Sequence, residues 1–310
     1  MTPSYRRDFL KTLLGGAAGL SLSARVFGQG SPTPITSTKI SDNFSLISGA
    51  GSNVVVLSSA EGLLMVNGGL PQFSSDLLKV VSAQGEAKRI QALINTDWHL
   101  ENTGSNDALG KTGTKIISHE NTKLWMKTEI VVQWQRKTYA PRAKEALPTQ
   151  TFYTTAKMLF GNEEVQYGYL GQAHTDGDMY VFFPGPNILV TGDTFTVGSY
   201  PVLDWSTGGW IGGLSEASRT LVGLANAQTR IIPGKGPVQT LADLKAQADM
   251  CAEMRTRFIA MMKKGMSAGA MAASAPTKDF DAKWGDPELF IANAYPGLWN
   301  HVRELGAGIL

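Results

Sequence analysis

The chain has 310 residues, of which 43% are apolar and 17% charged, with a single cysteine. This length and apolar content suffice for one large hydrophobic core, and the low charge without like-charge runs argues against a nucleic-acid-binding face. One cysteine, Cys251, excludes an intrachain disulfide, and its apolar neighbours at helical spacing predict a buried side chain.

The N-terminus has the features of an export signal. Ser-Tyr-Arg-Arg-Asp-Phe-Leu-Lys at residues 4–11 matches the twin-arginine pattern, and the apolar stretch 12–24 is too short to span a bilayer. We therefore expect residues 1–28 to be a signal peptide read by the twin-arginine export machinery, and the mature protein to be periplasmic or secreted. Removing them leaves 24 basic and 25 acidic residues. No later segment predicts a membrane span.

The remaining chain predicts one domain in which strands and helices alternate. Residues 29–42 are rich in Ser, Thr and Pro and predict a linker, followed by a domain over 43–310 that opens with an antiparallel meander. Strands are predicted at 44–48, 53–57, 63–66, 90–95, 115–118, 165–170, 179–183, 188–190 and 230–232. Helices are predicted at 72–84, 106–111, 121–134, 215–227 and 241–264. This order predicts an α/β fold.

Five polar, glycine-containing motifs lie at the ends of predicted strands. In chain order they are Val66–Gly69, Thr96–Gly104, Gly171–Asp178, Thr191–Thr194 and Ile232–Gly236. Together they resemble the metallo-β-lactamase superfamily, whose hallmark is H-x-H-x-D-H followed by separate His, Asp and His ligands. The resemblance covers roughly residues 43–300 and implies an αββα four-layer sandwich. The segment Phe280–Gly285 resembles the tail of a periplasmic branch of that superfamily.

The resemblance implies a metal site at the ends of these strands. Its first ligand set maps onto Asp97, His99 and His174, with Asp193 as a fourth or bridging carboxylate. Two imidazoles and a carboxylate serve zinc hydrolases and also iron or manganese proteins. We therefore predict one divalent metal, with zinc preferred and iron or manganese as alternatives.

The second ligand set of the family is altered in this chain. Glu101, Asn102 and Lys235 occupy its positions, and the four histidines of the chain cannot rebuild five imidazole ligands. A charged ammonium has no lone pair and repels a cation. We expect the second metal to be absent and Lys235 to supply part of its charge, paired with Asp193 or Glu101 because an unpaired buried ammonium is costly. Asn67 also replaces the aspartate usual in relatives.

These residues predict a hydrolase that acts on a small-molecule ester, lactone, thioester or amide. Asp193 or Glu101 would orient the attacking water or take its proton, and Lys235 would stabilise the oxyanion. An apolar substrate wall is expected from Tyr200, Trp205 and Trp210, with ordinary packing as the alternative. A second hypothesis is a catalytically silent member, needing no metal, that binds a small molecule or protein partner in the cleft. A third hypothesis is that the same ligand set binds iron or manganese and supports a redox reaction.

Overall fold

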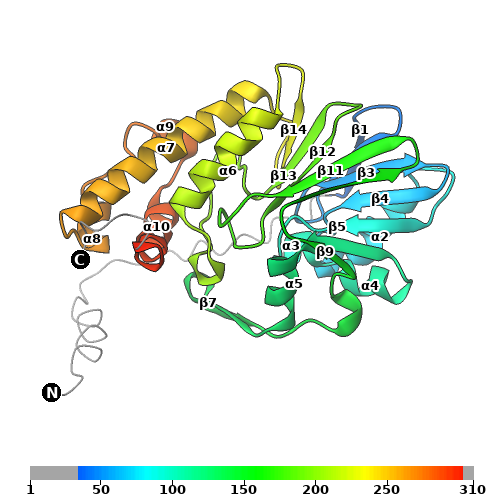
Figure 1. Ribbon diagram of the computed structural model, residues 1–310, viewed down its shortest axis with the longest axis horizontal. Helices are drawn as coiled ribbons and strands as arrows, with labels where there is room; N and C mark the ends of the chain where they lie inside the picture. Colours follow the sequence, from blue (N-terminus) through cyan, green and yellow to red (C-terminus); the bar gives the residue numbers. More distant parts are fainter. Residues whose placement is uncertain (1–33, 303–310) are drawn as a thin grey trace. The chain divides into compact units, whose positions relative to one another are not determined.

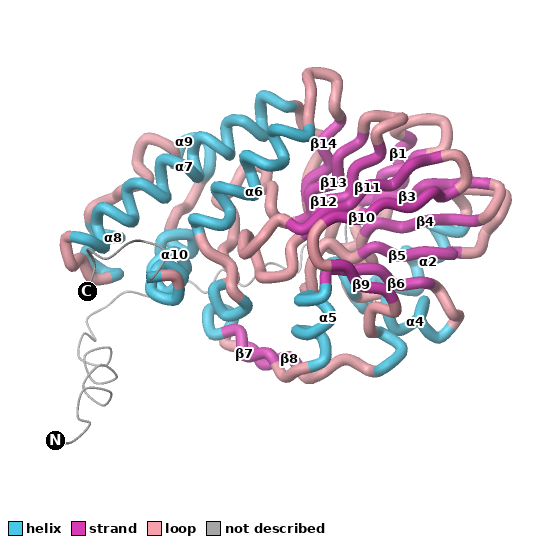
Figure 2. Tube along the Cα trace, viewed as in Figure 1, coloured by secondary structure: helices cyan, strands magenta, loops and turns pink. Residues whose placement is uncertain are grey.

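The computed structural model describes residues 34–302, and the predicted signal peptide lies outside them. Its centre is a pair of β-sheets with helices on the outer faces (Figures 1 and 2). The first sheet contains, in spatial order, β1 (Thr36–Lys39), β2 (Phe44–Ser48), β3 (Val54–Ser59), β4 (Gly62–Val66), β5 (Ile90–Ile94), β6 (Lys115–His119) and β9 (Gln150–Phe152). Strands β1 to β4 pair antiparallel, whereas β4, β5, β6 and β9 pair parallel.

The second sheet has five strands. In spatial order these are β10 (Thr155–Phe160), β11 (Glu163–Tyr169), β12 (Met179–Phe183), β13 (Ile188–Gly192) and β14 (Arg230–Pro233). Only the last pair, β13 and β14, is parallel. A separate hairpin joins β7 (Ile130–Val132) to β8 (Lys137–Tyr139).

The inner faces of the two sheets form one apolar layer. Strand β3 shows how its sequence produces this burial, since successive side chains of a strand point to opposite faces. Val55 and Leu57 join the core between the sheets, whereas Val54 and Val56 pack on the outer face of the first sheet. A strand buried on both faces reads as a continuous apolar run rather than an alternating one.

Helices cover both outer faces. On the first sheet lie α2 (Ser74–Ser82) and α4 (Asn106–Lys111), and on the second α6 (Ile211–Leu224), α7 (Leu241–Lys263) and α10 (Glu288–Asn300). Shorter elements are α3 (Leu100–Thr103), α5 (Glu120–Lys127), α8 (Ala268–Ala273), α9 (Asp281–Trp284), η1 (Pro71–Phe73), η2 (Gln133–Gln135), η3 (Lys144–Ala146) and η4 (Trp205–Thr207). The predicted αββα sandwich is confirmed. Within residues 34–302, no helix has both the length and the apolar composition that crossing a membrane requires.

Two element predictions are corrected by the structure. The helix predicted over 121–134 ends at Lys127, and Ile130–Val132 continues as strand β7. The β-branched run Ile130–Val132 favours an extended backbone. The sequence prediction had included these apolar residues in a helical pattern. Within the predicted linker 29–42, residues Thr36–Lys39 pair with β2, so the first sheet begins before the predicted domain boundary at 43. Helices α8, α9 and α10 had no predicted counterpart.

Parallel pairing places the polar motifs together. Strands β4 and β5 end at the same edge of the first sheet, and β13 and β14 end at the same edge of the second. Asp97 follows β5, Asp193 follows β13, and Lys235 lies two residues after β14. Ligands in α/β sheets bind at such carboxyl ends, and these loops therefore carry the candidate site.

Candidate metal centre

Four side chains from three loops converge at the strand ends. Asp97, His99, His174 and Asp193 each direct one ligand atom to a common point, and these atoms all lie within 4.8 Å of one another. The first three side chains are buried and Asp193 is half-buried. The structure thus brings together all four residues for which the sequence predicts metal binding.

The two imidazoles face each other through the nitrogens that a metal would need. His174 Nε2 lies 2.8 Å from His99 Nδ1. Their outer nitrogens meet oxygen acceptors, since His99 Nε2 lies 3.2 Å from Asp204 Oδ2 and His174 Nδ1 lies 2.8 Å from the Val202 carbonyl. Both outer nitrogens must therefore carry hydrogen, and one further hydrogen must lie between the rings. A divalent cation bound by both inner nitrogens would displace that hydrogen.

Asp204 is a functional candidate that the sequence did not predict. Its fully buried carboxylate accepts hydrogen bonds from Thr207 Oγ1 at 2.7 Å and from Trp134 Nε1 at 2.9 Å, besides contacting His99. Burial alone would lower the pKa of His99, but the hydrogen bond to Asp204 and the charge of Asp97 outweigh it and raise that pKa to about 10. Asp204 thus fixes the orientation of the His99 ring and favours its protonated form, in which both ring nitrogens donate.

Asn102 connects the two candidate carboxylate ligands. Its Nδ2 donates to Asp97 Oδ2 at 2.7 Å and to Asp193 Oδ2 at 2.9 Å. Burial and then the nearby Asp193 raise the pKa of Asp97. Burial also acts to raise the pKa of Asp193, yet the charges of His174 and Lys235 prevail and lower it. A proton shared by this pair would therefore reside on Asp97.

Lys235 lies beside the cluster and pairs with one of its two predicted partners. Its Nζ is 3.5 Å from Glu101 Oε1, and 62% of the lysine side chain is exposed. Burial would lower the pKa of Lys235, but Asp193 and Glu101 together raise it, so the ammonium stays charged. Gly234 allows this loop to approach, because a Cβ there would lie 2.0 Å from Asp193 Oδ1.

The loop that carries Lys235 is held by a residue outside the predicted motifs. Asn53 Nδ2 donates to the Pro233 carbonyl at 2.9 Å and to the Gly236 carbonyl at 2.8 Å. The backbone NH of Asn53 donates to the Gly234 carbonyl at 2.7 Å. Three hydrogen bonds from one residue therefore fix the backbone on both sides of Lys235.

The donor set fits one cation and not two. The first set offers two imidazole lone pairs and two carboxylates in one buried cluster, a mixture that divalent metals accept. At the second set, the Asn102 amide presents its NH₂ group to both carboxylates, and the Lys235 ammonium lies against Glu101. The ammonium offers no lone pair, and the NH₂ group of Asn102 is a donor. Asn102 Oδ1, buried and without a hydrogen-bond partner within residues 34–302, is therefore a single neutral oxygen, which is too few donors for a second cation.

Two neighbouring polar residues support the ligand loops without joining the cluster. Asn67 adopts a left-handed conformation with φ of 67°, and its Oδ1 accepts from the Thr96 NH and hydroxyl at 3.0 Å each. Asp178 accepts from the backbone NH groups of His174 and Thr175 at 2.5 and 2.8 Å, which orders their turn. Burial, followed by the charge of Asp97, raises the pKa of Asp178 to about 7.

The predicted aromatic substrate wall is wrong for two of its three residues. Tyr200 is buried, stacks on Phe290 with ring centroids 5.0 Å apart, and donates to Asp281. Trp210 is buried and stacks on His301 at 4.4 Å. Both therefore pack within the helical layer, which was the alternative interpretation. Only Trp205 is half-buried.

Other aromatic residues lie closer to the cluster. Trp98 and His99 have ring centroids 4.3 Å apart, and Tyr139 packs edge-on against Trp98 at 5.2 Å. Trp134, half-buried on the β7–β8 hairpin, reaches Asp204. The sequence prediction placed residues 121–134 on a helix, so this hairpin and its aromatic residues were not expected beside the site.

The sequence is similar to known metal-dependent hydrolases. The family model described as "Metallo-beta-lactamase superfamily" matches residues 47–240. A curated relative, "Metallo-beta-lactamase type 2" of Bacillus sp. (strain 170), is 26% identical over 142 residues, which cover 46% of this chain and 49% of the relative. The chain thus spans about half the length of this curated relative.

Solved structures share the fold. The metallo-β-lactamase from Pontibacter korlensis matches with a TM-score of 0.57 and 18% identity, over 71% of this chain and 99% of that one. A stereoselective inverting sec-alkylsulfatase from Pseudomonas sp. matches with a TM-score of 0.64 and 12% identity, over 86% of this chain and 50% of that one. With the family model matching well over half of the sequence, the chain belongs to the metallo-β-lactamase superfamily.

Proposed function

We propose that this protein is a single-metal hydrolase that acts on an ester, lactone, thioester or amide carbonyl. The observation that carries the proposal is the arrangement of His99 and His174, whose inner nitrogens face one another while oxygen acceptors hold the outer ones. Asp97 and Asp193 complete the ligand set, and we take zinc as the metal, with iron or manganese as alternatives. A divalent cation bound there would supply Lewis acidity toward a carbonyl oxygen and a water molecule.

The surrounding side chains have separate roles in this proposal. Asn102 holds the carboxylates of Asp97 and Asp193 at a fixed separation. Glu101, whose side chain is 28% exposed, accepts a proton from the attacking water, because Lys235 is the one side chain within residues 34–302 that pairs with its carboxylate. Lys235 donates to the substrate oxygen as negative charge develops on it.

The experiment is metal analysis of the purified protein combined with calorimetry. We expect one divalent cation per chain, and at least one proton released per cation, because the hydrogen between the two imidazoles must leave. A substrate panel should include a β-lactam and a secondary alkyl sulfate beside simple carbonyl compounds, since similar proteins are described as acting on such groups. Two cations per chain, or binding without proton release, would contradict the proposed site.

A catalytically silent binding protein is the second candidate. It is favoured by the fact that the four candidate ligands already have hydrogen-bond partners within the cluster, since the imidazoles bond each other and Asn102 donates to both carboxylates. The same metal analysis separates the candidates. Less than a tenth of a cation per chain, with no turnover of the panel, would support the silent binder.

Lys235→Gln should lower kcat by roughly 100- to 1,000-fold, the range for losing one donor at a developing charge. The midpoint of thermal unfolding should change little, because exposed ion pairs contribute only about 0–1 kcal/mol. Lys235→Arg, which keeps the charge, should retain more activity. Unchanged kcat in Lys235→Gln would contradict the role of the ammonium.

Lys235→His tests the one-metal site separately. The new imidazole alone should not bring a second cation, because the Asn102 NH₂ group still points to both carboxylates. Metal analysis should therefore still give one cation per chain. Two cations per chain would show that Lys235 alone blocks the second site.

We further propose that the protein is exported through the twin-arginine pathway to the periplasm or beyond. The support is the Arg6-Arg7 pattern followed by a short apolar stretch. Fractionation of cells that express the full chain tests it. Arg6→Lys together with Arg7→Lys should retain the protein inside the cell, and unaltered export of that variant would contradict the proposal.

A further inference from the structure

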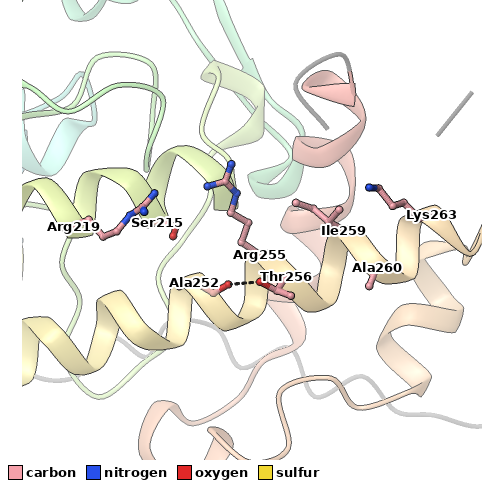
Figure 3. Close-up of a pocket in the computed structure, with 8 residues that line it drawn as sticks. All are labelled: Ser215, Arg219, Ala252, Arg255, Thr256, Ile259, Ala260 and Lys263. Atoms are coloured by element: carbon pink, nitrogen blue, oxygen red, sulfur yellow. Dashed lines mark hydrogen bonds between the residues drawn. The ribbon is translucent and has the colours of Figure 1, made fainter. Parts of the chain in front are cut away.

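A groove separate from the metal centre lies between helices α6 and α7. It has a volume of about 490 Å³ and is shown in Figure 3. On α7 the lining positions run from Ala252 to Lys263 at intervals of three and four residues, and on α6 they are Ser215 and Arg219. Residues at these intervals share one face of a helix, so the groove is a continuous strip along both helices.

The charged side chains that line this groove are all cationic. They are Arg219, Arg255 and Lys263. Arg255 is held in place, since its guanidinium pairs with Glu216 at 3.2 Å and lies 5.9 Å from the Trp210 ring. Arg219 and Lys263 form no ion pair with any other residue between 34 and 302. The groove therefore keeps an excess of positive charge after the Glu216 pair is counted.

The cations stand at separate points with an apolar surface between them. Arg255 and Lys263 are eight residues apart on one helix face, which corresponds to about 12 Å along the axis. Ile259 and Ala260 fill the interval, and Figure 3 places both between the two cationic side chains. A single small anion cannot contact both charged ends, and its hydration shell would gain nothing from the apolar centre.

We propose that this groove binds an elongated small-molecule dianion, a dicarboxylate whose two charged ends are joined by an alkyl chain. One carboxylate would lie between Arg219 and Arg255, where two guanidinium groups offer paired donors. The alkyl chain would lie on Ile259 and Ala260, and the second carboxylate would meet Lys263. This site is independent of the proposed hydrolase activity.

The test is isothermal titration calorimetry of the full protein with decanedioate, decanoate, decane-1,10-diol and tripolyphosphate. Decanedioate should bind one per chain, several-fold more tightly than decanoate, and the diol should not bind. Arg219→Gln combined with Lys263→Gln should weaken decanedioate by about tenfold, the combined effect of two exposed charge pairs. Both side chains are exposed, so this variant should keep its fold.

The matched control is Lys127→Gln combined with Lys245→Gln, which removes the same charge from exposed helix positions outside the groove. Its affinity for decanedioate should stay within about twofold of the unmodified protein, as expected for screened distant charges. Equal losses in both double variants would overturn the proposal, as would the absence of saturable binding. Tighter binding of tripolyphosphate than of decanedioate would also overturn it, because the apolar centre would then have no role.

Discussion

Replacing either His99 or His174 with alanine is expected to abolish stoichiometric metal binding and hydrolysis. Each ring presents one nitrogen to the cluster and donates from the other to an oxygen acceptor. Neither oxygen acceptor can therefore replace the imidazole as a metal ligand. Loss of even an outer partner of a ligand costs about 10- to 100-fold in affinity, and loss of the ligand itself should exceed 100-fold. Competition with a chromophoric chelator measures the affinity, and turnover of the active substrate measures the chemistry.

His119→Ala is the control for these variants. His119 is also a buried imidazole, stacked on Tyr169 with centroids 3.8 Å apart, but it is no part of the ligand cluster. Its loss should lower the midpoint of thermal unfolding and leave one cation per chain. Full metal content and turnover in His99→Ala or His174→Ala would refute the metal centre.

The layered fold could be predicted from the sequence because its central strands are continuous apolar runs that end at polar, glycine-containing motifs. Strand β12 and helix α4 have the predicted bounds. Strands β1 and β8 were missed because they are short and mostly exposed, and an exposed strand has no apolar pattern.

The ligand cluster could be predicted because its members lie in motifs that resemble those of the metallo-β-lactamase superfamily. The residues that support the cluster could not be predicted from the sequence. Asn53 lies 180 residues before the Pro233 carbonyl that it binds, and Asp204 lies 105 residues after His99. A hydrogen bond across such a distance leaves no spacing signal in one sequence. The aromatic residues Tyr200 and Trp210 were misplaced for the same reason, since their partners come from helix α10 and the residue that follows it.

Asp204→Asn and Asp204→Ala are expected to lower metal affinity by about 10- to 100-fold, as for other outer partners of metal-binding histidines. In the folded protein, the Asp204 carboxylate accepts from three donors, on His99, Thr207 and Trp134. Alanine leaves these donors without an acceptor in a buried position, which should also reduce the free energy of unfolding by about 1–3 kcal/mol. Asparagine keeps the shape and one acceptor but removes the charge that stabilises the His99 imidazolium.

The comparison between the two variants shows whether Asp204 positions His99 or only supports the fold. Asp281→Ala is the matched control, because Asp281 also accepts a partly buried hydrogen bond, from Tyr200 at 2.8 Å, but lies among the helices. A positioning role requires that Asp204→Asn lose metal affinity in a chelator competition while its unfolding midpoint stays near that of the unmodified protein. If instead affinity changes only in proportion to stability, in Asp204 and Asp281 variants alike, the carboxylate would be a structural residue. The imidazole pair would then owe its orientation to Val202 and to packing against Trp98.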